Sequence, residues 1–105
     1  MCKLDHVALC VKEYDWYISF FETVFEMKIK KESGTEPERK LWFDKGIQLI
    51  ESKEKPIPGT LYDHIAFKAD DKEVIYTRLK AQGGKEYLQK ENWFIVRDAL
   101  VVEIL

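Results

Sequence analysis

The chain of 105 residues contains two histidines, and both stand in the same short stretch of sequence. His6 lies in DHVALCV and His64 lies in DHIAFKA, so each histidine follows an aspartate and opens an apolar run. A neutral imidazole can bind a metal ion, and an imidazole can also transfer a proton near neutral pH. Packing alone gives no reason to repeat a histidine in this way, so the repetition indicates a shared chemical role.

A second pair of polar residues interrupts two apolar runs. Gln48 lies in IQLI and Glu103 lies in VEIL, near the ends of the two halves of the chain. Imidazole combined with carboxylate and amide oxygens suits a divalent first-row metal. The pattern therefore predicts a metal site made by His6, Gln48, His64 and Glu103. A plainer interpretation stays open, because a lone strand histidine is often a packed core or edge residue and a polar strand residue is often solvated.

Two similar series of elements carry these residues. In the first half the pattern predicts an amphipathic helix at 13–28, capped by Asp15, among strands at 4–11, 27–33, 39–44 and 47–52. The second half restarts with a helix at 70–84, begun by Asp70 or Asp71 and ended by Gly-Gly, among strands at 63–69, 85–90, 92–98 and 99–105. An internal duplication of strand, helix and three strands is the most economical explanation.

A chain of this length suits one compact domain. We expect a single domain over residues 1–105, with a first module at 1–52, a linker at 53–61 and a second module at 62–105. The linker assignment depends on the charged, proline- and glycine-containing segment SKEKPIPGTLYD. In the second helix, the apolar residues Val74, Ile75 and Leu79 are expected to face the core.

Strand alternation decides which way the candidate ligands point, because successive strand side chains face opposite sides of a sheet. His6 shares a face with Ala8 and Cys10, while the bulkier Val and Leu residues of that strand form the natural seat of the helix. If a pseudo-twofold relates the halves, His6 corresponds to His64 and Gln48 to Glu103. Four donors then converge on one surface, whereas Glu51 points the other way and is expected to be solvated.

Composition argues against several functional classes. The formal net charge is −2, and the 17 basic and 19 acidic residues are interspersed. No basic stripe indicates nucleic-acid binding, and no basic amphipathic helix indicates a membrane surface. The N-terminal sequence lacks the pattern of a signal peptide, no apolar run approaches a membrane span, and two cysteines make no disulfide framework. We therefore expect a cytoplasmic protein that binds neither nucleic acid nor a membrane.

Four stretches carry a resemblance to a known family: LDHVALCVKEYDWYISFFETVFEMKI, GIQLIE, DHIAFKADDKE and VRDALVVEIL. Their order and spacing resemble the vicinal oxygen chelate superfamily, which includes glyoxalase I, bleomycin-resistance proteins and extradiol dioxygenases. The resemblance implies an α+β fold of two tandem βαβββ modules, whose sheets curl around a cleft. It also implies that the family's four metal ligands fall on His6, Gln48, His64 and Glu103, with Glu103 moving protons as well.

The resemblance implies several functions. One is a metal-dependent enzyme, like a glyoxalase I (a lactoylglutathione lyase) or an epimerase, which isomerises a small oxygenated substrate through an enediolate with Zn, Ni, Co, Mn or Fe as cofactor. Another is a metal-free homodimer of the bleomycin-resistance type that has a small-molecule partner in its cleft, for which Trp42, Trp93 and Tyr62 are candidate walls. An extradiol dioxygenase is a third, which the short chain and the lack of a further histidine argue against. A homodimer is expected for the enzyme as well.

Overall fold

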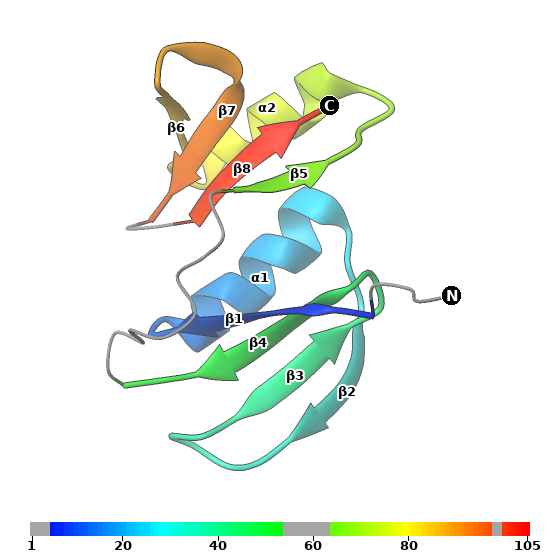
Figure 1. Ribbon diagram of the computed structural model, residues 1–105, viewed down its shortest axis with the longest axis vertical. Coiled ribbons are helices and arrows are strands. Elements are labelled where there is room, and N and C mark those ends of the chain that lie inside the picture. Colours follow the sequence, from blue (N-terminus) through cyan, green and yellow to red (C-terminus); the bar gives the residue numbers. More distant parts are fainter. Residues whose placement is uncertain (1–4, 54–63, 98–99) are drawn as a thin grey trace. The chain divides into compact units, whose positions relative to one another are not determined.

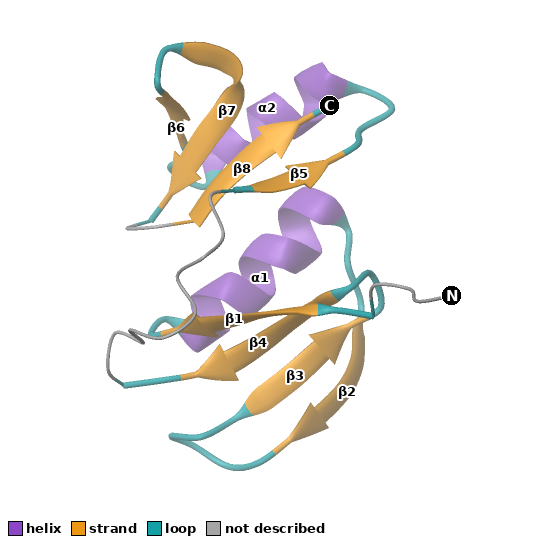
Figure 2. Cartoon of the chain, viewed as in Figure 1, coloured by secondary structure: helices purple, strands orange, loops and turns teal. Residues whose placement is uncertain are grey.

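The computed structural model of the protein describes residues 5–53, 64–97 and 100–105 (Figure 1). The chain divides into two compact units, Met1–Pro58 and Gly59–Leu105. Within the described residues each unit is a four-stranded mixed sheet with one helix (Figure 2). Most of the predicted linker and Tyr62, one of the candidate cleft walls, lie outside the described residues.

The first unit follows the predicted series of one strand, one helix and three strands. Its elements are β1 (Val7–Val11), α1 (Tyr14–Phe25), β2 (Ile29–Ser33), β3 (Lys40–Phe43) and β4 (Ile47–Glu51). The strands pair in the order β1-β4-β3-β2, with β1 parallel to β4 and the other pairs antiparallel. The parallel pairing is possible because the α1 crossover and two further strands separate β1 from β4 in sequence.

The second unit repeats this architecture with shorter elements. Its elements are β5 (Ile65–Phe67), α2 (Lys72–Ala81), β6 (Lys85–Tyr87), β7 (Lys90–Val96) and β8 (Leu100–Ile104). The strand order β5-β8-β7-β6 matches that of the first unit, and β5 is again parallel to β8. The predicted α+β fold of two βαβββ modules is therefore confirmed.

The core of the first unit lies between α1 and one face of its sheet. Phe20 and Phe21 of α1 are completely buried, and the ring centroid of Phe21 lies 5.5 Å from that of Phe43 in β3. Leu9 is buried on β1, whereas Ala8 is exposed, as strand alternation predicts. The opposite face of the sheet, which α1 leaves uncovered, is called the open face below and carries Ala8 and Gln48.

The helix of the second unit, α2, is less apolar than α1, and the prediction that Val74 faces the core is wrong. Leu79 is fully buried, and the ring of Tyr76 packs 5.4 Å from that of Phe94. Val74 is 41% exposed instead of facing the core. At about 100° per residue, Val74 lies on the far side of the helix from the stripe that includes Ile75, Tyr76 and Leu79.

The two helices begin differently. Asp71 caps α2 as predicted, because its carboxylate accepts hydrogen bonds from the backbone N–H of Glu73 and Val74. The predicted cap of α1 is wrong: Glu13 occupies the cap position without a side-chain cap bond, and Asp15 lies in the first turn. An acidic residue there still interacts favourably with the helix dipole.

The expectation that Glu51 is solvated is wrong, because its side chain is only 10% exposed. Glu51 pairs with Val11 in the β1–β4 register and therefore lies on the helix side of the sheet. Arg39 donates to its carboxylate from Nε at 2.8 Å and from Nη2 at 2.7 Å, and also donates to Asp15. The guanidinium carbon of Arg39 lies 4.6 Å from the ring centroid of Tyr14. Arg39 thus links the start of α1 to the ends of β3 and β4.

Candidate metal site

The first unit aligns its two predicted ligands on the open face. Gln48 pairs with Ala8 of β1 on one side and with Trp42 of β3 on the other. His6 lies two residues before Ala8, so strand alternation directs its ring to the same face. Gln48 is 6% exposed, and the His6 side chain is 36% exposed.

The second unit brings its two predicted ligands into direct contact. Nε2 of His64 lies 3.2 Å from Oε1 of Glu103, and the two side chains are 29% and 20% exposed. Asn92 donates from Nδ2 to Oε2 of the same carboxylate at 3.5 Å. The ring centroids of His64 and Trp93 are 4.2 Å apart, so the indole forms one wall beside the pair.

The two pairs occupy corresponding positions of the two sheets. Glu103 lies between Ala66 of β5 and Trp93 of β7, just as Gln48 lies between an alanine and a tryptophan in the first unit. The correspondence of Gln48 with Glu103 proposed from the sequence therefore holds at the level of strand register. The same correspondence relates Trp42 to Trp93, which were predicted from the sequence only as candidate walls of a ligand-binding cleft.

The donor chemistry of these residues fits a divalent first-row metal. Metal bonds of about 2.0–2.2 Å at angles of about 90–110° separate two neighbouring ligand atoms by about 2.8–3.6 Å. The 3.2 Å between Nε2 of His64 and Oε1 of Glu103 lies in this range. In neither unit do three His, Cys, Asp or Glu side chains of the described residues group closely enough to hold a metal. Each unit supplies two of the four predicted ligands. That all four bind one metal ion stays a prediction.

Asp5 orients His6, a role that was not predicted from the sequence. Nδ1 of His6 lies 2.6 Å from Oδ2 of Asp5, and this hydrogen bond lowers the pKa of the Asp5 carboxyl. An ionised carboxylate only accepts hydrogen bonds, so Nδ1 carries the hydrogen, and in the neutral imidazole Nε2 then has the lone pair. The signal was present in the repeated Asp-His pair, because carboxylates commonly orient histidine ligands in this way.

A pocket of about 290 Å³ opens beside His6. Lys30, Lys31 and Trp42 also line it, and Nζ of Lys31 lies 4.9 Å from the centroid of the Trp42 ring. In the second unit, Nζ of Lys90 lies 4.7 Å from the Trp93 ring. These two lysines were not predicted from the sequence, because strand irregularities in the β2–β3 and β6–β7 pairs shift their register.

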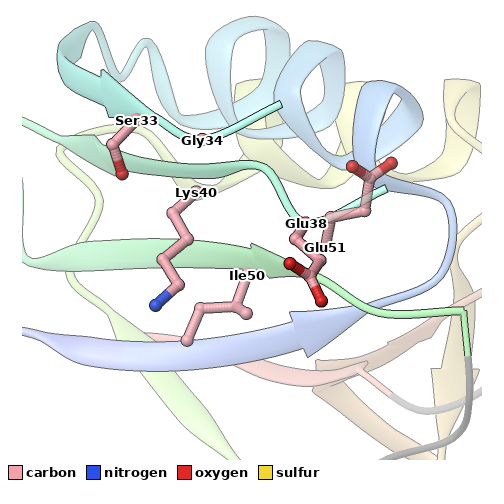
Figure 3. Close-up of a pocket in the computed structure, with 6 residues that line it drawn as sticks. All are labelled: Ser33, Gly34, Glu38, Lys40, Ile50 and Glu51. Carbon is pink, nitrogen blue, oxygen red and sulfur yellow. The ribbon is translucent and has the colours of Figure 1, made fainter. Parts of the chain in front are cut away.

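A second pocket of the first unit has a volume of about 540 Å³ and contains none of the predicted ligands. Figure 3 shows its lining, in which the Lys40 side chain extends toward Ile50 on the neighbouring strand. The backbone turn through Gly34 and the ion-paired Glu51 complete its wall. This pocket lies at the other end of the strands from His6, about 7 Å beyond Gln48 by strand rise.

Comparison with known proteins identifies the family. Residues 3–88 match the family model of the Glyoxalase/Bleomycin resistance protein/Dioxygenase superfamily. No curated protein matches the chain. Among solved structures, the fosfomycin resistance protein FosX from Listeria monocytogenes is 24% identical, with a TM-score of 0.78 over 99% of this chain and 90% of that one.

Two further solved structures share the fold. FosX from Mesorhizobium loti is 19% identical, with a TM-score of 0.77 over 99% of this chain and 90% of its own. A glyoxalase family protein from Enterococcus faecalis is 22% identical, with a TM-score of 0.71 over 97% of this chain and 95% of its own. Within the described residues, no helix is long and apolar enough to cross a membrane. With its paired βαβββ modules and its match over most of its length, the chain belongs to the Glyoxalase/Bleomycin resistance protein/Dioxygenase superfamily, the vicinal oxygen chelate proteins.

Proposed function

We propose that the protein is a metal-dependent enzyme that isomerises, or adds a group to, a small substrate with vicinal oxygens. His6, Gln48, His64 and Glu103 hold the divalent metal. The observation that carries this proposal is the 3.2 Å separation of Nε2 of His64 and Oε1 of Glu103, which is the spacing of two neighbouring ligands. The proposal includes a homodimer as the working form.

The roles of the protein groups follow from their chemistry. When bound, a divalent cation supplies Lewis-acid polarisation of a substrate carbonyl or hydroxyl oxygen. Glu103 accepts a proton from the substrate and returns it, since a carboxylate can do this near neutral pH whereas the amide of Gln48 cannot. Asn92 steadies Oε2 of Glu103, and Asp5 leaves Nε2 of His6 available as a ligand atom.

Two FosX crystal structures support the choice of cofactor and substrate class. The Listeria monocytogenes protein was crystallised with Mn(II) and sulfate ion. Its E126Q mutant was crystallised with Mn(II) and 1S,2S-dihydroxypropylphosphonic acid, whose name describes two adjacent hydroxyl groups. For the present chain the donor set is compatible with Mn, Fe, Co, Ni or Zn, because none of the four ligands is a thiolate.

A second candidate function is a metal-free binding protein. It is favoured by the indoles of Trp42 and Trp93, which stand beside Gln48 and Glu103 and could stack on a planar ligand. The enzyme proposal is preferred because a sequestering protein has no need of a histidine in contact with a carboxylate. Metal affinity separates the two functions directly.

Metal binding is tested on protein purified without a histidine tag and stripped with a chelator. Wild type should bind one divalent ion per chain, measured by elemental analysis and calorimetry. His64→Ala and Glu103→Ala should each weaken binding by roughly 100-fold or more, because each removes a ligand. Glu91→Ala, which removes an exposed carboxylate from β7, is the matched control and should bind as wild type does. Wild-type affinity in both ligand variants would contradict the proposed site.

Proton transfer is tested by two reciprocal substitutions. Glu103→Gln should lower turnover by roughly 10²-fold or more, because the amide cannot accept the proton. Gln48→Glu should retain both metal and activity, because it keeps an oxygen ligand. Methylglyoxal hemithioacetals and epimerisable acyl thioesters are the first substrates to test. Equal turnover of Glu103→Gln and wild type would remove Glu103 from the proposed mechanism.

A further inference from the structure

We infer that a bulge in β7 turns the side chain of Asn92 toward Glu103, and that Asn92 is a positioning residue which leaves Oε1 of Glu103 as the oxygen that binds the metal. The inference deepens the proposed function, on which it rests for the role of Glu103 as a ligand. It concerns the second unit alone and starts from the pairing of β7 with its two neighbours, β6 and β8 (Figure 1).

The strand β7 is irregular just before the candidate site. Neighbouring residues of β6 pair with Phe94 and with Lys90, so positions 91–93 of β7 lie opposite no residue of β6. On its other side, the pairing of β7 with β8 begins at Trp93. Among the described residues, Asn92 is therefore paired in neither ladder. Bulges of this kind commonly redirect side chains next to functional sites.

Two consecutive side chains of β7 reach the same pair of candidate ligands. In a regular strand, Asn92 and Trp93 would face opposite sides of the sheet. Instead, Nδ2 of Asn92 lies 3.5 Å from Oε2 of Glu103. The ring centroid of Trp93 lies 4.2 Å from that of His64, which in turn contacts Glu103. The bulge therefore brings to the ligands a polar side chain that regular alternation would have pointed to the other face.

The first unit shows where the same position points when the strand is regular. Trp42 is the counterpart of Trp93 in strand register, so the preceding residue, Leu41, is the counterpart of Asn92. Leu41 is paired with residues of both neighbouring strands and is completely buried in the core. Because the two units share their strand order, the bulge explains why Asn92 reaches the ligands and Leu41 does not.

The two units also differ in the ligand that requires orientation. The side-chain amide of Gln48 has one oxygen that can bind a metal, whereas the carboxylate of Glu103 has two equivalent oxygens. Oε1 of Glu103 lies 3.2 Å from Nε2 of His64, and Oε2 faces Asn92. An ionised carboxylate only accepts hydrogen bonds, so the amide nitrogen of Asn92 is the atom that faces it. This donor occupies Oε2 and leaves Oε1 to the metal, so that each unit supplies one oxygen.

The hydrogen bond from Asn92 is long at 3.5 Å. Hydrogen bonds at functional sites are commonly long before the ligand binds and shorten in the complex. Asn92 and Glu103 are both partly buried, and a hydrogen bond is stronger where little water competes for it. Outer partners of metal ligands typically contribute about 10–100-fold to metal affinity, so the loss of this one is measurable.

The contact is tested first on the full chain, ¹⁵N-labelled and freed of metal by a chelator. The side-chain amide signals of Asn92 are followed by NMR in wild type and in Glu103→Ala. One of the two amide hydrogens should be shifted downfield in wild type and should lose this shift in the variant, because its acceptor is removed. Glu91→Ala changes an exposed neighbour in the same bulge and should leave the shift in place.

Co(II) then tests the effect on metal binding, because the visible absorption of the bound ion weakens as its coordination number rises. Asn92→Leu keeps the approximate size of the side chain and removes its donors. It should lower the affinity for Co(II) roughly ten-fold, because Glu103 is no longer held in place, and weaken the absorption, because Oε2 becomes free to bind. Asn92→Gln restores an N–H donor and should recover most of both. A merely structural role for Asn92 would change the melting temperature and leave the absorption per bound ion unchanged.

The outcomes distinguish this inference from the proposed function. Wild type that takes up no Co(II) would overturn the proposed function, and the NMR result would still decide whether Asn92 holds Glu103. Wild type that binds Co(II) with an affinity and absorption equal to those of Asn92→Leu would overturn the inference and leave the metal site standing. Amide signals of Asn92 that do not respond to Glu103→Ala would overturn the inference as well, independently of any metal.

Discussion

Three of the four candidate ligands, His6, His64 and Glu103, have a neighbour that restrains the functional atom. Asp5 restrains His6, Asn92 and His64 restrain Glu103, and the bond between Asp5 and His6 is the shortest of these contacts at 2.6 Å. Such neighbours fix which ring nitrogen carries the hydrogen and raise the basicity of the other. The chemistry of the site therefore depends on residues that touch no metal.

At the residue scale, Asp5→Ala should weaken divalent-metal binding by roughly ten-fold, because outer carboxylates commonly contribute 10–100-fold and Asp5 is well exposed. Nitrogen NMR of the His6 ring should show the hydrogen less strongly confined to Nδ1 than in wild type. Asp44→Asn changes another carboxylate of the same pocket without touching His6 and should leave both measurements unchanged. An unaltered His6 tautomer in Asp5→Ala would remove this orienting role.

At the element scale, the pairing of Arg39 with Glu51 links α1 to the ends of β3 and β4. The hydrogen bonds from Arg39 hold the pKa of Glu51 below its usual value of 4.5. A carboxyl whose pKa is lower in the folded chain stabilises the fold above its unfolded pKa, and this contribution is lost as the pH falls through the folded value. The stabilisation is therefore fully present at pH 7, begins to decline near pH 4.5 and is lost as the pH falls through the lower pKa of the folded chain.

Glu51→Gln should consequently lower the melting temperature by several degrees at pH 7. The gap to wild type should close as the pH falls below 4.5, because wild type then protonates the same group. Glu22→Gln, at an exposed position of α1, is the control and should show little difference at either pH. A gap that stays constant from pH 7 to pH 3 would mean that ionisation of Glu51 does not stabilise the fold.

Two turns of the first unit offer a second test at this scale. Gly34 and Gly46 both have positive φ angles, of 78° and 82°. A Cβ at residue 34 would lie 2.5 Å from the carbonyl oxygen of Glu38, whereas at residue 46 its nearest neighbour would be 3.7 Å away. Urea unfolding should show a loss of about 1 kcal/mol for Gly46→Ala and of about 2–4 kcal/mol for Gly34→Ala, since only the latter adds a clash to the strain. Equal losses would show that the backbone around residue 34 relaxes.

At the scale of the whole molecule, each sheet of the described residues has two edge strands that pair on one side only, β1 and β2 in the first unit and β5 and β6 in the second. Every residue of β2 is exposed. Such edges are commonly covered by pairing with another strand or by association with another chain. A twofold dimer covers the same edge on both of its subunits. Sedimentation at micromolar concentration should therefore give twice the 12.5 kDa mass of the chain. A monomer would contradict the dimer, while leaving the metal stoichiometry of one per chain as a separate measurement.

The amino-acid sequence by itself determined the architecture of each unit. The three- and four-residue spacing of aromatic side chains defined α1, and strand alternation placed Ala8 on the open face and Leu9 in the core. The repeated Asp-His pair revealed the duplication and two of the candidate ligands. These signals were readable because each depends on residues that are close in sequence, whose periodicity reports burial directly.

Only the tertiary structure decided which distant residues meet. Strand pairing set Gln48 beside Trp42 and Glu103 beside Trp93, although turn lengths separate these pairs differently in sequence. The same assembly buried Glu51 against Arg39, although Glu51 was expected from the sequence to be solvated. Such contacts depend on sheet register and on irregular strand pairing, and a shift of one residue would move a side chain to the other face. Local patterns do not contain that information, because the register is settled when all four strands of a sheet pack together.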